Sequence, residues 1–314
     1  MLLSIVIPAY NSREYIYECL NSIFSQIVND IEVILVNDGS TDSTVDIIKK
    51  EFEIHIKNNR LKIFHQENSG PGSARNRGLK ECKGKYITFL DSDDIILDDY
   101  FNEIIPLIFP DKYEIIEHGF KRFINIENIN SVKYKKLYSL SGGHKLSTIR
   151  NEIFSKTVWY PSIRIFKKTI WNNHRFPEGV FYEDPIAIHE IFLNDYLIYF
   201  TNRPLLGYRI NPNSTTSLHL AAHLLDLIKF YNSLTEITTP VIIMKIRLAR
   251  SILYFYHEFQ VYDLLVHNVM LNLKILPRNL QVVSNLLPID LFFFIFPRTY
   301  RMINKIRFLW VFKK

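Results

Sequence analysis

The stretch Tyr86-Ile87-Thr88-Phe89-Leu90-Asp91-Ser92-Asp93-Asp94 joins an apolar run directly to a cluster of acidic residues. The run predicts a buried β-strand, so the carboxylates would lie at its carboxyl end. Carboxylates gathered at one place repel one another and are stable there mainly when a cation neutralises them. Oxygen ligands suit Mg²⁺ or Mn²⁺, which are usually shared with substrate phosphates. The alternative is a solvated acidic turn in which Asp94 or Asp98 caps the next helix.

Three strand-like runs precede this strand and alternate with three amphipathic helical patterns. Asn11 and Glu14 resemble a capping box at the start of the first helix. This order predicts an α/β fold with a mostly parallel sheet flanked by helices on both faces. In such sheets, ligands bind beyond the carboxyl ends of the strands. The strands are expected at Leu3–Ile7, Ile31–Val36 and Leu61–Phe64, and the helices at 12–28, 42–52 and 71–82.

Two more polar segments follow strands. Val36 to Asp42 places Asp38 where the chain leaves the sheet, and a carboxylate there can accept a base N–H or a ribose hydroxyl. An Asx turn with a helix N-cap is the alternative. Gln66 to Gly78 is a glycine-containing turn that runs into a helix with two arginines, which suits an anionic ligand. A structural turn with surface arginines is the alternative, and the segment matches neither the P-loop nor the GxGxxG fingerprint.

The four segments together are far more specific than any one of them. In order and spacing they resemble the inverting family 2 glycosyltransferases with the GT-A fold, the nucleotide-diphospho-sugar transferase fold. The resemblance is strong over residues 1–120, moderate to about residue 220, and absent as a motif beyond. It rests on Ile7-Pro8-Ala9-Tyr10-Asn11, Val36-Asn37-Asp38-Gly39-Ser40-Thr41-Asp42, Asn68-Ser69-Gly70-Pro71-Gly72-Ser73-Ala74-Arg75-Asn76 and Phe89-Leu90-Asp91-Ser92-Asp93-Asp94.

The resemblance implies a UDP-sugar site and a DxD motif made by Asp91 and Asp93. Asp91 would approach the ribose and the sugar, and Asp93 would ligate a divalent metal, Mn²⁺ or Mg²⁺, that bridges the two phosphates. Asn37 stands where many members carry Asp, which removes one charge. The floor under the uracil would be Pro8, Ala9 and Tyr10; Asp38 would contact the uracil, Arg75 would lie near the nucleotide, and Ser92 would belong to the donor site.

The resemblance extends to Glu183-Asp184, which is similar to the pair in which the family places its catalytic base. Asp184 is favoured over Glu183 as the group that takes the proton of the acceptor hydroxyl. The alternative is that Asp184-Pro185 merely caps a helix. Further on, Tyr208 to Ser217 resembles the family's segment near the donor phosphates, where Arg209 would pair with the diphosphate and His219 would complete the metal shell. An ordinary polar loop is the alternative there.

Residues 113–220 carry weaker patterns. They predict strands at Tyr113–His118, Trp159–Phe166 and Leu197–Phe200, a helix at Asp184–Leu193, and a polar, irregular segment at 125–150. From about residue 221 the pattern is helical, with breaks near four prolines. We therefore expect a catalytic domain over residues 1–220 and a helical C-terminal extension over 221–314.

Charge is unevenly distributed along the 314 residues. Residues 221–314 hold 12 Lys and Arg against 5 Asp and Glu, whereas the other 220 residues hold 26 against 27. The apolar run Leu291 to Phe296 is followed by basic and aromatic residues with no acid from 291 onward. This composition suits an interfacial helix on an anionic leaflet. The alternatives are a core helix pair with a solvated basic face, or a dimer contact.

Other features exclude classes of protein. The two cysteines, Cys19 and Cys82, form neither a disulfide framework nor a CxxC metal pair, which favours a reduced, intracellular compartment. No apolar stretch reaches the roughly 18 residues of a spanning helix. Met1 to Pro8 is typical of a first strand rather than of a signal segment. No recognised nucleic-acid module is present.

The sequence thus predicts an inverting, metal-dependent transfer of a hexose or N-acetylhexosamine from a UDP-sugar to a glycan or lipid-linked glycan. The expected setting is bacterial polysaccharide or lipooligosaccharide synthesis, on the cytoplasmic face of the inner membrane. Two alternatives stay open: a polyprenyl-phosphate glycosyltransferase, and a catalytically inactive protein that binds nucleotide sugars. The sequence does not identify the sugar, the acceptor, the linkage or the oligomeric state.

Overall fold

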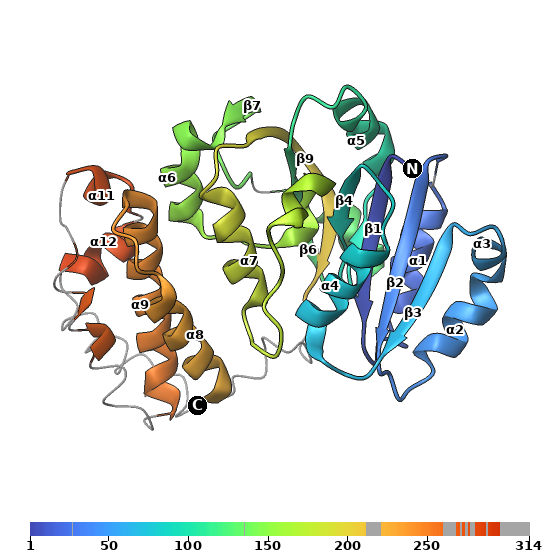
Figure 1. Ribbon diagram of the computed structural model, residues 1–314, viewed down its shortest axis with the longest axis horizontal. Helices are drawn as coiled ribbons and strands as arrows, with labels where there is room; N and C mark the ends of the chain where they lie inside the picture. The colour runs from blue at the N-terminus through green and yellow to red at the C-terminus, as the bar shows by residue number, and fades with distance from the viewer. Residues whose placement is uncertain are drawn as a thin grey trace. The chain divides into compact units, whose positions relative to one another are not determined.

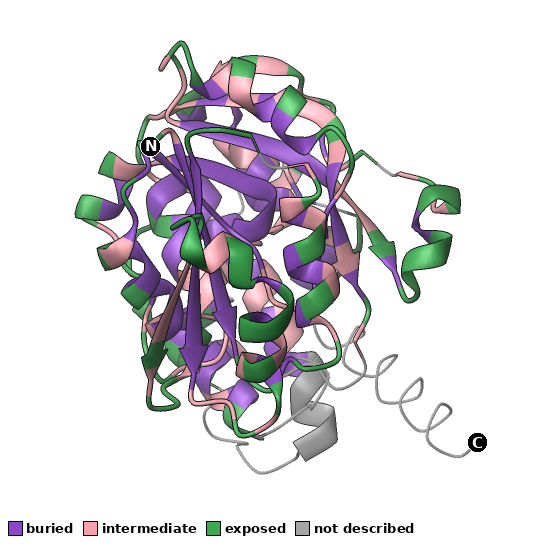
Figure 2. Cartoon of the chain, turned by 90° about the vertical axis from the view of Figure 1, so that its right-hand side faces the viewer, coloured by how far each residue is buried: buried purple, intermediate pink, exposed green. Residues whose placement is uncertain are grey.

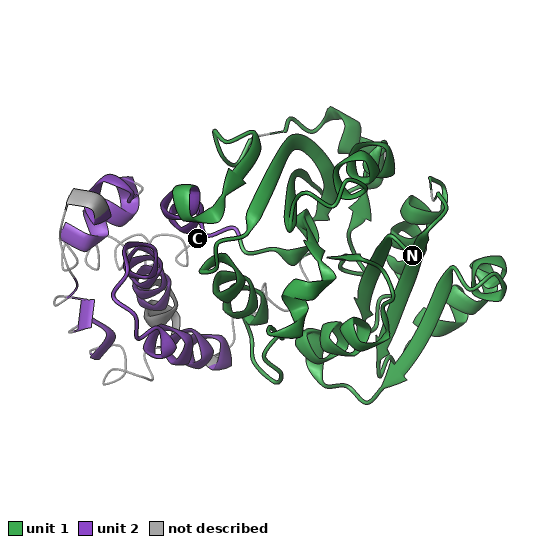
Figure 3. Cartoon of the chain, turned by 45° about the horizontal axis from the view of Figure 1, so that its top comes forward, with its two compact units in different colours: residues 1–148, 159–214 green, residues 149–158, 215–314 purple. Residues whose placement is uncertain are grey.

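The computed structural model describes residues 1–26, 28–134, 136–211, 221–259, 268–270, 272–273, 276, 280–286 and 288–295. The chain divides into two compact units, residues 1–148 with 159–214 and residues 149–158 with 215–314 (Figure 3). The predicted domain boundary at residue 220 lies in the segment 212–220, which is outside the described residues. His219 belongs to the same segment, and residues 296–314 are also outside the described residues.

The first unit begins with the predicted alternation of strands and helices. Strands β1, β2, β3 and β4 are parallel and lie in the order β3-β2-β1-β4. Every residue of β1, β2 and β4 is buried, which fits the near-continuous apolar runs of strands covered on both faces. The elements are β1 (Leu3–Ala9), α1 (Ile16–Phe24), β2 (Ile31–Asp38), α2 (Thr44–Glu51), α3 (Glu53–Lys57), β3 (Leu61–Gln66), α4 (Gly70–Glu81) and β4 (Tyr86–Phe89).

Among the described residues, five later strands extend this sheet to nine. The order continues from β4 through β8, β6, β9 and β5, and β7 pairs with β9. β8 is antiparallel to both β4 and β6, whereas β6 and β9 are parallel. The predicted α/β class with a flanked sheet is confirmed (Figure 1). These elements are β5 (Ile95–Ile96), α5 (Tyr100–Ile108), β6 (Ile115–Phe123), β7 (Gly142–Lys145), α6 (Leu146–Lys156), β8 (Arg164–Lys167), α7 (Glu183–Phe192) and β9 (Leu197–Arg209).

Helices cover both faces of the parallel strands. Right-handed crossovers place α1 and α2 on one face, and α4, whose connection crosses back over the sheet, on the other (Figure 1). Helix α4 packs closely because Gly78 faces Val6; a Cβ at Gly78 would lie 2.3 Å from Val6 Cγ1. The buried strands form the centre of the unit (Figure 2).

Some local predictions differ from the structure. Helix α1 begins at Ile16 and not at residue 12, and the capping box does not form, because the Asn11 side chain accepts the backbone N–H of Thr41 at 2.8 Å. The segment 125–150 is not wholly irregular: it contains a 3-10 helix at Ile126–Ser131, strand β7 and the start of α6. The predicted strand at Trp159–Phe166 begins only at Arg164, after the 3-10 helix Pro161–Ile163, because proline has no N–H for a sheet ladder.

The described part of the second unit is helical, as predicted for the C-terminal region. Its helices are the part of α6 from Ile149 onward, α8 (Ala221–Ser233), α9 (Thr239–Phe259), α11 (Leu280–Ser284) and α12 (Pro288–Ile295). Helix α12 is joined to α9 by Asp290, whose carboxylate lies 2.9 Å from Arg247 Nη1 and 2.7 Å from Arg250 Nε. Within the described residues, no helix combines the length and the apolar character needed to cross a bilayer.

Candidate active site

The carboxyl ends of β1 and β2 are tied together by a network of loop hydrogen bonds. Asn11 N–H donates to Ser40 Oγ at 3.0 Å, and Asn11 Oδ1 accepts Thr41 N–H. Ser12 N–H donates to Thr44 Oγ1 at 2.8 Å. These bonds fix the loop that carries Tyr10, whose side chain is 49% exposed next to the buried Ala9 and Pro8. Pro8, Ala9 and Tyr10, which are predicted to form the floor under the uracil, therefore lie at the edge of the sheet where the four motifs meet.

Asp38 is buried, and both oxygens of its carboxylate accept hydrogen bonds from the chain. Oδ1 accepts Ser69 N–H at 2.9 Å and Gln66 Nε2 at 2.8 Å, and Oδ2 accepts Gly70 N–H at 2.9 Å. This carboxylate therefore holds the turn between β3 and α4, about 30 residues away, rather than the local Asx turn that was the alternative from the sequence. The uracil contact of Asp38 stays a prediction.

Three carboxylates crowd the carboxyl end of β4. Asp94 is buried; its Oδ1 accepts Arg209 N–H at 2.8 Å, whereas Oδ2 has no hydrogen-bond partner among the described residues. Asp93 Oδ2 accepts Asn211 Nδ2 at 3.1 Å. Burial and the charge of Asp91 raise the pKa of Asp93, and burial, Asp91 and Asp93 raise the pKa of Asp94. The described residues thus leave this acidic corner, Asp91 to Asp94, with more negative than positive charge.

Asp91 and Asp93 are the residues that would hold a divalent cation. Asp91 and Asp93 repel each other, and the neighbouring buried Asp94 Oδ2 has no partner among the described residues; a hard cation relieves both, so the acidic corner fits one. Within the described part of the chain, no three His, Cys, Asp or Glu side chains are gathered as a ready metal shell. Because His219 lies outside that part, its proposed ligation is a prediction only.

Arg75 joins the acidic corner to the Glu-Asp pair. The side chain is 3% exposed and lies over the Phe176 ring, 5.3 Å from its centroid. Nη2 lies 2.8 Å from Asp91 Oδ1, and Nη1 lies 2.7 Å from Glu183 Oε1 and 2.9 Å from Asp184 Oδ1. Burial lowers the pKa of Arg75, but the three carboxylates raise it by more, so the net shift is upward and the guanidinium stays protonated. One cation thus holds the two groups of carboxylates together.

Glu183 and Asp184 open helix α7 after a constrained turn. Tyr182 precedes them with φ of 65°, a left-handed conformation that is rare for a bulky residue and is often found at functional sites. Burial raises the pKa of Asp184; Arg75 opposes this, and the charges of Glu183 and Asp91 add to it. A carboxylate with a raised pKa is a stronger base.

Helix α4 holds this segment through residues that the sequence analysis did not single out. Asn76 Oδ1 accepts Phe176 N–H at 3.0 Å, and Asn76 Nδ2 donates to Phe176 O at 2.8 Å and to Glu178 Oε1 at 2.9 Å. Gly72 lets the segment approach, because a Cβ there would lie 2.4 Å from Pro177 O. Both residues stand in the quoted Asn68 to Asn76 motif, but their partners are about 100 residues away along the chain.

Arg209 and Ser92 have partners within the chain. Arg209 is 8% exposed; Nε donates to Asp93 O at 2.7 Å, and the guanidinium pairs with Glu18 and lies 4.8 Å from the Tyr15 ring centroid. The guanidinium therefore braces the acidic corner from α1, and a contact with diphosphate would need the Glu18 pair to open. Ser92 Oγ lies 2.7 Å from Ser12 Oγ and joins the corner to the β1 loop.

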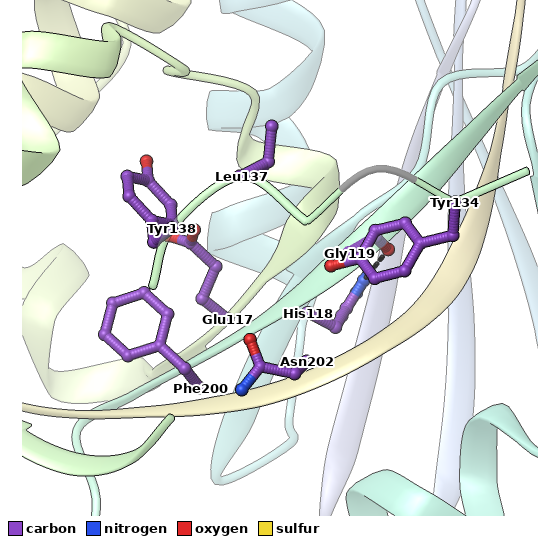
Figure 4. Close-up of a pocket in the computed structure, with 8 residues that line it drawn as sticks. All are labelled: Glu117, His118, Gly119, Tyr134, Leu137, Tyr138, Phe200 and Asn202. Atoms are coloured by element: carbon purple, nitrogen blue, oxygen red, sulfur yellow. Dashed lines mark hydrogen bonds between the residues drawn. The ribbon is translucent and has the colours of Figure 1, made fainter. Parts of the chain in front are cut away.

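A small cavity lies away from this edge, between β6, the segment around Tyr138, and β9 (Figure 4). It encloses about 10 Å³, roughly the room of one water molecule. His118 borders it, and burial lowers the pKa of His118 to about 4, so the ring is neutral at pH 7. The cavity is too small for a sugar and is not a substrate site.

Comparisons with known proteins identify the family of the chain. The family model "Glycosyl transferase family 2" matches residues 4–169. Glycosyltransferase GlyA of Streptococcus pneumoniae is 29% identical over 218 residues, which cover 68% of this chain but only 31% of GlyA.

Two solved structures are similar in fold. Residues 1–349 of S. aureus TarS, in complex with UDP-GlcNAc, match with a TM-score of 0.69 at 20% identity, over 97% of this chain and 89% of that one. The mannosyltransferase PcManGT of Pyrobaculum calidifontis, in complex with GDP-Man and Mn²⁺, matches with a TM-score of 0.54 at 15% identity, over 98% and 87%. The fold is thus the predicted GT-A fold, and this chain belongs to glycosyl transferase family 2.

Proposed function

We propose that this glycosyltransferase moves a hexose or N-acetylhexosamine from a UDP-sugar to a glycan acceptor, with inversion at the anomeric carbon. The UDP-GlcNAc bound to TarS supports a UDP-sugar donor. The setting that we propose is the synthesis of a bacterial surface polysaccharide or lipooligosaccharide. The observation that carries the proposal is the Arg75 bridge, because it holds a donor-side carboxylate, Asp91, beside the base candidates Glu183 and Asp184.

The chemistry assigned to the chain is a proton transfer at Asp184. As the acceptor oxygen forms its bond to the anomeric carbon, its proton passes to the Asp184 carboxylate. The bond from that carbon to the diphosphate oxygen breaks, and its electron pair leaves with UDP. Attack from the face opposite the diphosphate inverts the configuration. The pKa of Asp184 is raised toward neutral pH, which makes its carboxylate a stronger base, and Arg75 fixes the orientation of that carboxylate.

We also propose that Asp91 and Asp93 hold a divalent cation, and the Mn²⁺ bound to PcManGT supports this assignment. When bound, such a cation neutralises charge on the leaving diphosphate. The chain's own part is to present two carboxylates whose repulsion favours a cation, braced by Arg209 from the other side.

The test is a screen of UDP-sugars for UDP release in the presence of Mn²⁺, with UDP-GlcNAc first. Asp184→Asn should lower turnover by about 10²- to 10⁴-fold because it removes the proton acceptor, with UDP affinity retained. Asp46→Asn, an exposed carboxylate on α2, is the matched control and should leave turnover unchanged.

Three outcomes would contradict the proposal. Full turnover in Asp184→Asn with intact UDP binding would remove the base assignment. UDP binding without release from any UDP-sugar would favour an inactive binding protein. Turnover that a polyprenyl phosphate stimulates and a glycan does not would favour the lipid-phosphate acceptor.

A further inference from the structure

Three aromatic rings and one arginine gather at the carboxyl ends of β6 and β9. The rings of Tyr160 and Tyr208 are stacked, with centroids 5.3 Å apart and planes inclined by 25°. Phe120 lies 5.7 Å from Tyr160 and 5.9 Å from Tyr208. The Arg122 guanidinium lies 5.9 Å from the Phe120 centroid and 5.8 Å from that of Tyr208. We call these four residues the aromatic platform.

The pairing of β6 with β9 determines which face the platform occupies. Arg122 is the cross-strand partner of Tyr208, and Phe123 is that of Arg209. Because side chains alternate along a strand, Arg122 and Tyr208 share one face, and Phe123 and Arg209 share the other. The second face is buried, with the Arg209 guanidinium 4.5 Å from the Phe123 centroid. On the first face the three rings are only half-buried and Arg122 is exposed, so this face is accessible.

The platform borders the acidic corner. Tyr208 directly precedes Arg209, whose backbone N–H donates to Asp94 Oδ1 at 2.8 Å, so Tyr208 lies beside the corner. Burial and the nearby Tyr160, Asp91, Asp94 and Asp93 also raise the pKa of Tyr208. The 3-10 helix that follows Tyr160 leads into β8, which is antiparallel to β4, and this brings it to the end of β4 where the corner begins. A ligand on the platform would therefore lie beside the site of sugar transfer.

Arg122 differs from the other arginines of this region. Arg209 pairs with Glu18, and Arg164 pairs with Glu117 at 2.7 Å, so each of these two guanidinium groups has a carboxylate partner within the chain. Arg122 contacts only the two rings and has no carboxylate partner among the described residues. A planar guanidinium forms two parallel hydrogen bonds to a phosphate or carboxylate, and here the rings below already orient it.

We propose that the aromatic platform is an acceptor subsite for a sugar ring that carries an anionic group, either a phosphate or a carboxylate. The apolar C–H face of the ring packs on the face of Tyr160 that is not stacked on Tyr208. Arg122 pairs with the anionic group. The inference rests on the proposed function, since it names the acceptor of that same site.

The experiment measures binding of three matched probes to the full chain by saturation-transfer NMR. They are methyl glucoside, methyl glucuronide and methyl glucoside 6-phosphate, each with UDP and Mn²⁺ present so that the donor site is filled. At least one charged glycoside should bind about tenfold more tightly than methyl glucoside. Which charged glycoside binds more tightly distinguishes a phosphate from a carboxylate source.

Three variants assign the effect to the platform. Arg122→Gln should abolish the preference for charged probes, and Tyr160→Ala should weaken all three probes, whereas Tyr160→Phe should retain them. Arg203→Gln, an exposed arginine of β9 that pairs with Glu103, is the matched control and should keep the preference.

Equal binding of the three probes, no binding of any, or an unchanged preference in Arg122→Gln would overturn the subsite. Loss of the preference in Arg203→Gln would also overturn it, because the effect would then be general surface charge. UDP affinity of the wild-type chain is measured separately by calorimetry. If UDP does not bind, the proposed function fails, and the probes are repeated without UDP to test the platform alone.

Discussion

Arg75 carries one positive charge and lies among three carboxylates, Asp91, Glu183 and Asp184. The resemblance to the family implies that Arg75 lies near the nucleotide. The structure adds a role in holding the base candidates, which no local pattern suggests, because two of its three partners are more than 100 residues away. Since one guanidinium cannot neutralise three carboxylates, the cluster retains negative charge, which is consistent with a further cation at the donor side.

Gly72 provides a test in which the sign of the effect is informative. If Gly72 were an ordinary helical glycine, Gly72→Ala would stabilise the protein by about 0.5–1 kcal/mol. We expect the opposite, a loss of about 1–3 kcal/mol, because the new Cβ would lie 2.4 Å from Pro177 O and must displace the segment that carries Glu183. Urea unfolding at pH 7 measures the change.

A matched helix-surface change separates the two readings of Gly72. Lys80→Ala alters an exposed position of the same helix and should stay within about 0.5 kcal/mol of wild type. A Gly72→Ala protein more stable than wild type would show that the contact with Pro177 is unimportant.

Strands β1, β2 and β3 are linked at their amino ends by the buried carboxylate of Glu32. It accepts Ser4 Oγ at 2.7 Å, Lys62 Nζ at 2.6 Å and Lys83 N–H at 2.5 Å. Burial raises the pKa of Glu32, but the bonds from Lys62, Ser4 and Lys83 lower it by more. The charged form is therefore favoured in the folded state.

Glu32→Gln should destabilise the protein by about 2 kcal/mol at pH 7, because it removes charge-assisted bonds between three strands. The pKa of Glu32 is lower in the folded than in the unfolded state, so its contribution is full above about pH 5. It is lost as the pH falls through the folded pKa. Urea unfolding of wild type and variant at pH 7 and at pH 3 should show the difference shrinking at pH 3. A constant difference would rule out the linkage.

The charge of the whole chain is concentrated in its last third, where basic residues outnumber acidic ones by 12 to 5. In the described part of that region, helix α12 exposes Ile289 and Ile295, at 47% and 45%. Apolar side chains near a basic segment are typical of a surface that lies on an anionic leaflet. We therefore propose peripheral binding to the cytoplasmic face of the membrane.

Sedimentation with vesicles tests this proposal. The full chain should bind vesicles that contain anionic lipid and dissociate as salt rises, because the attraction is screened. Replacing Arg298, Arg301, Lys305 and Arg307 together by Gln should weaken binding by about 10³-fold, at roughly 1 kcal/mol per basic residue. The matched control replaces four exposed lysines of the first unit by Gln: Lys49, Lys50, Lys57 and Lys80. Equal binding by both variants, or binding that is independent of salt, would contradict the proposal.

The α/β class, the strands of the first 90 residues and the edge where the four motifs meet could be predicted from the sequence. This was possible because they depend on short-range information: apolar runs, helical periodicity and polar residues at strand ends. The Glu-Asp pair could be found only through the resemblance to the family. Helix caps and helix ends could be predicted less well. Asn11 is an example, because its side chain bonds the loop after β2 and not the helix that follows it.

The tertiary structure decided which side chains act on one another. The bridge made by Arg75, the approach of the Pro177 segment to Gly72 and the platform around Arg122 each join residues from distant parts of the chain. The pattern of residues along the sequence does not predict such pairs, because sheet order and crossover geometry, not sequence spacing, bring them together. The residue types at the site could therefore be predicted from the sequence, whereas their partners, burial and pKa shifts followed only from the packing of the sheet and its helices.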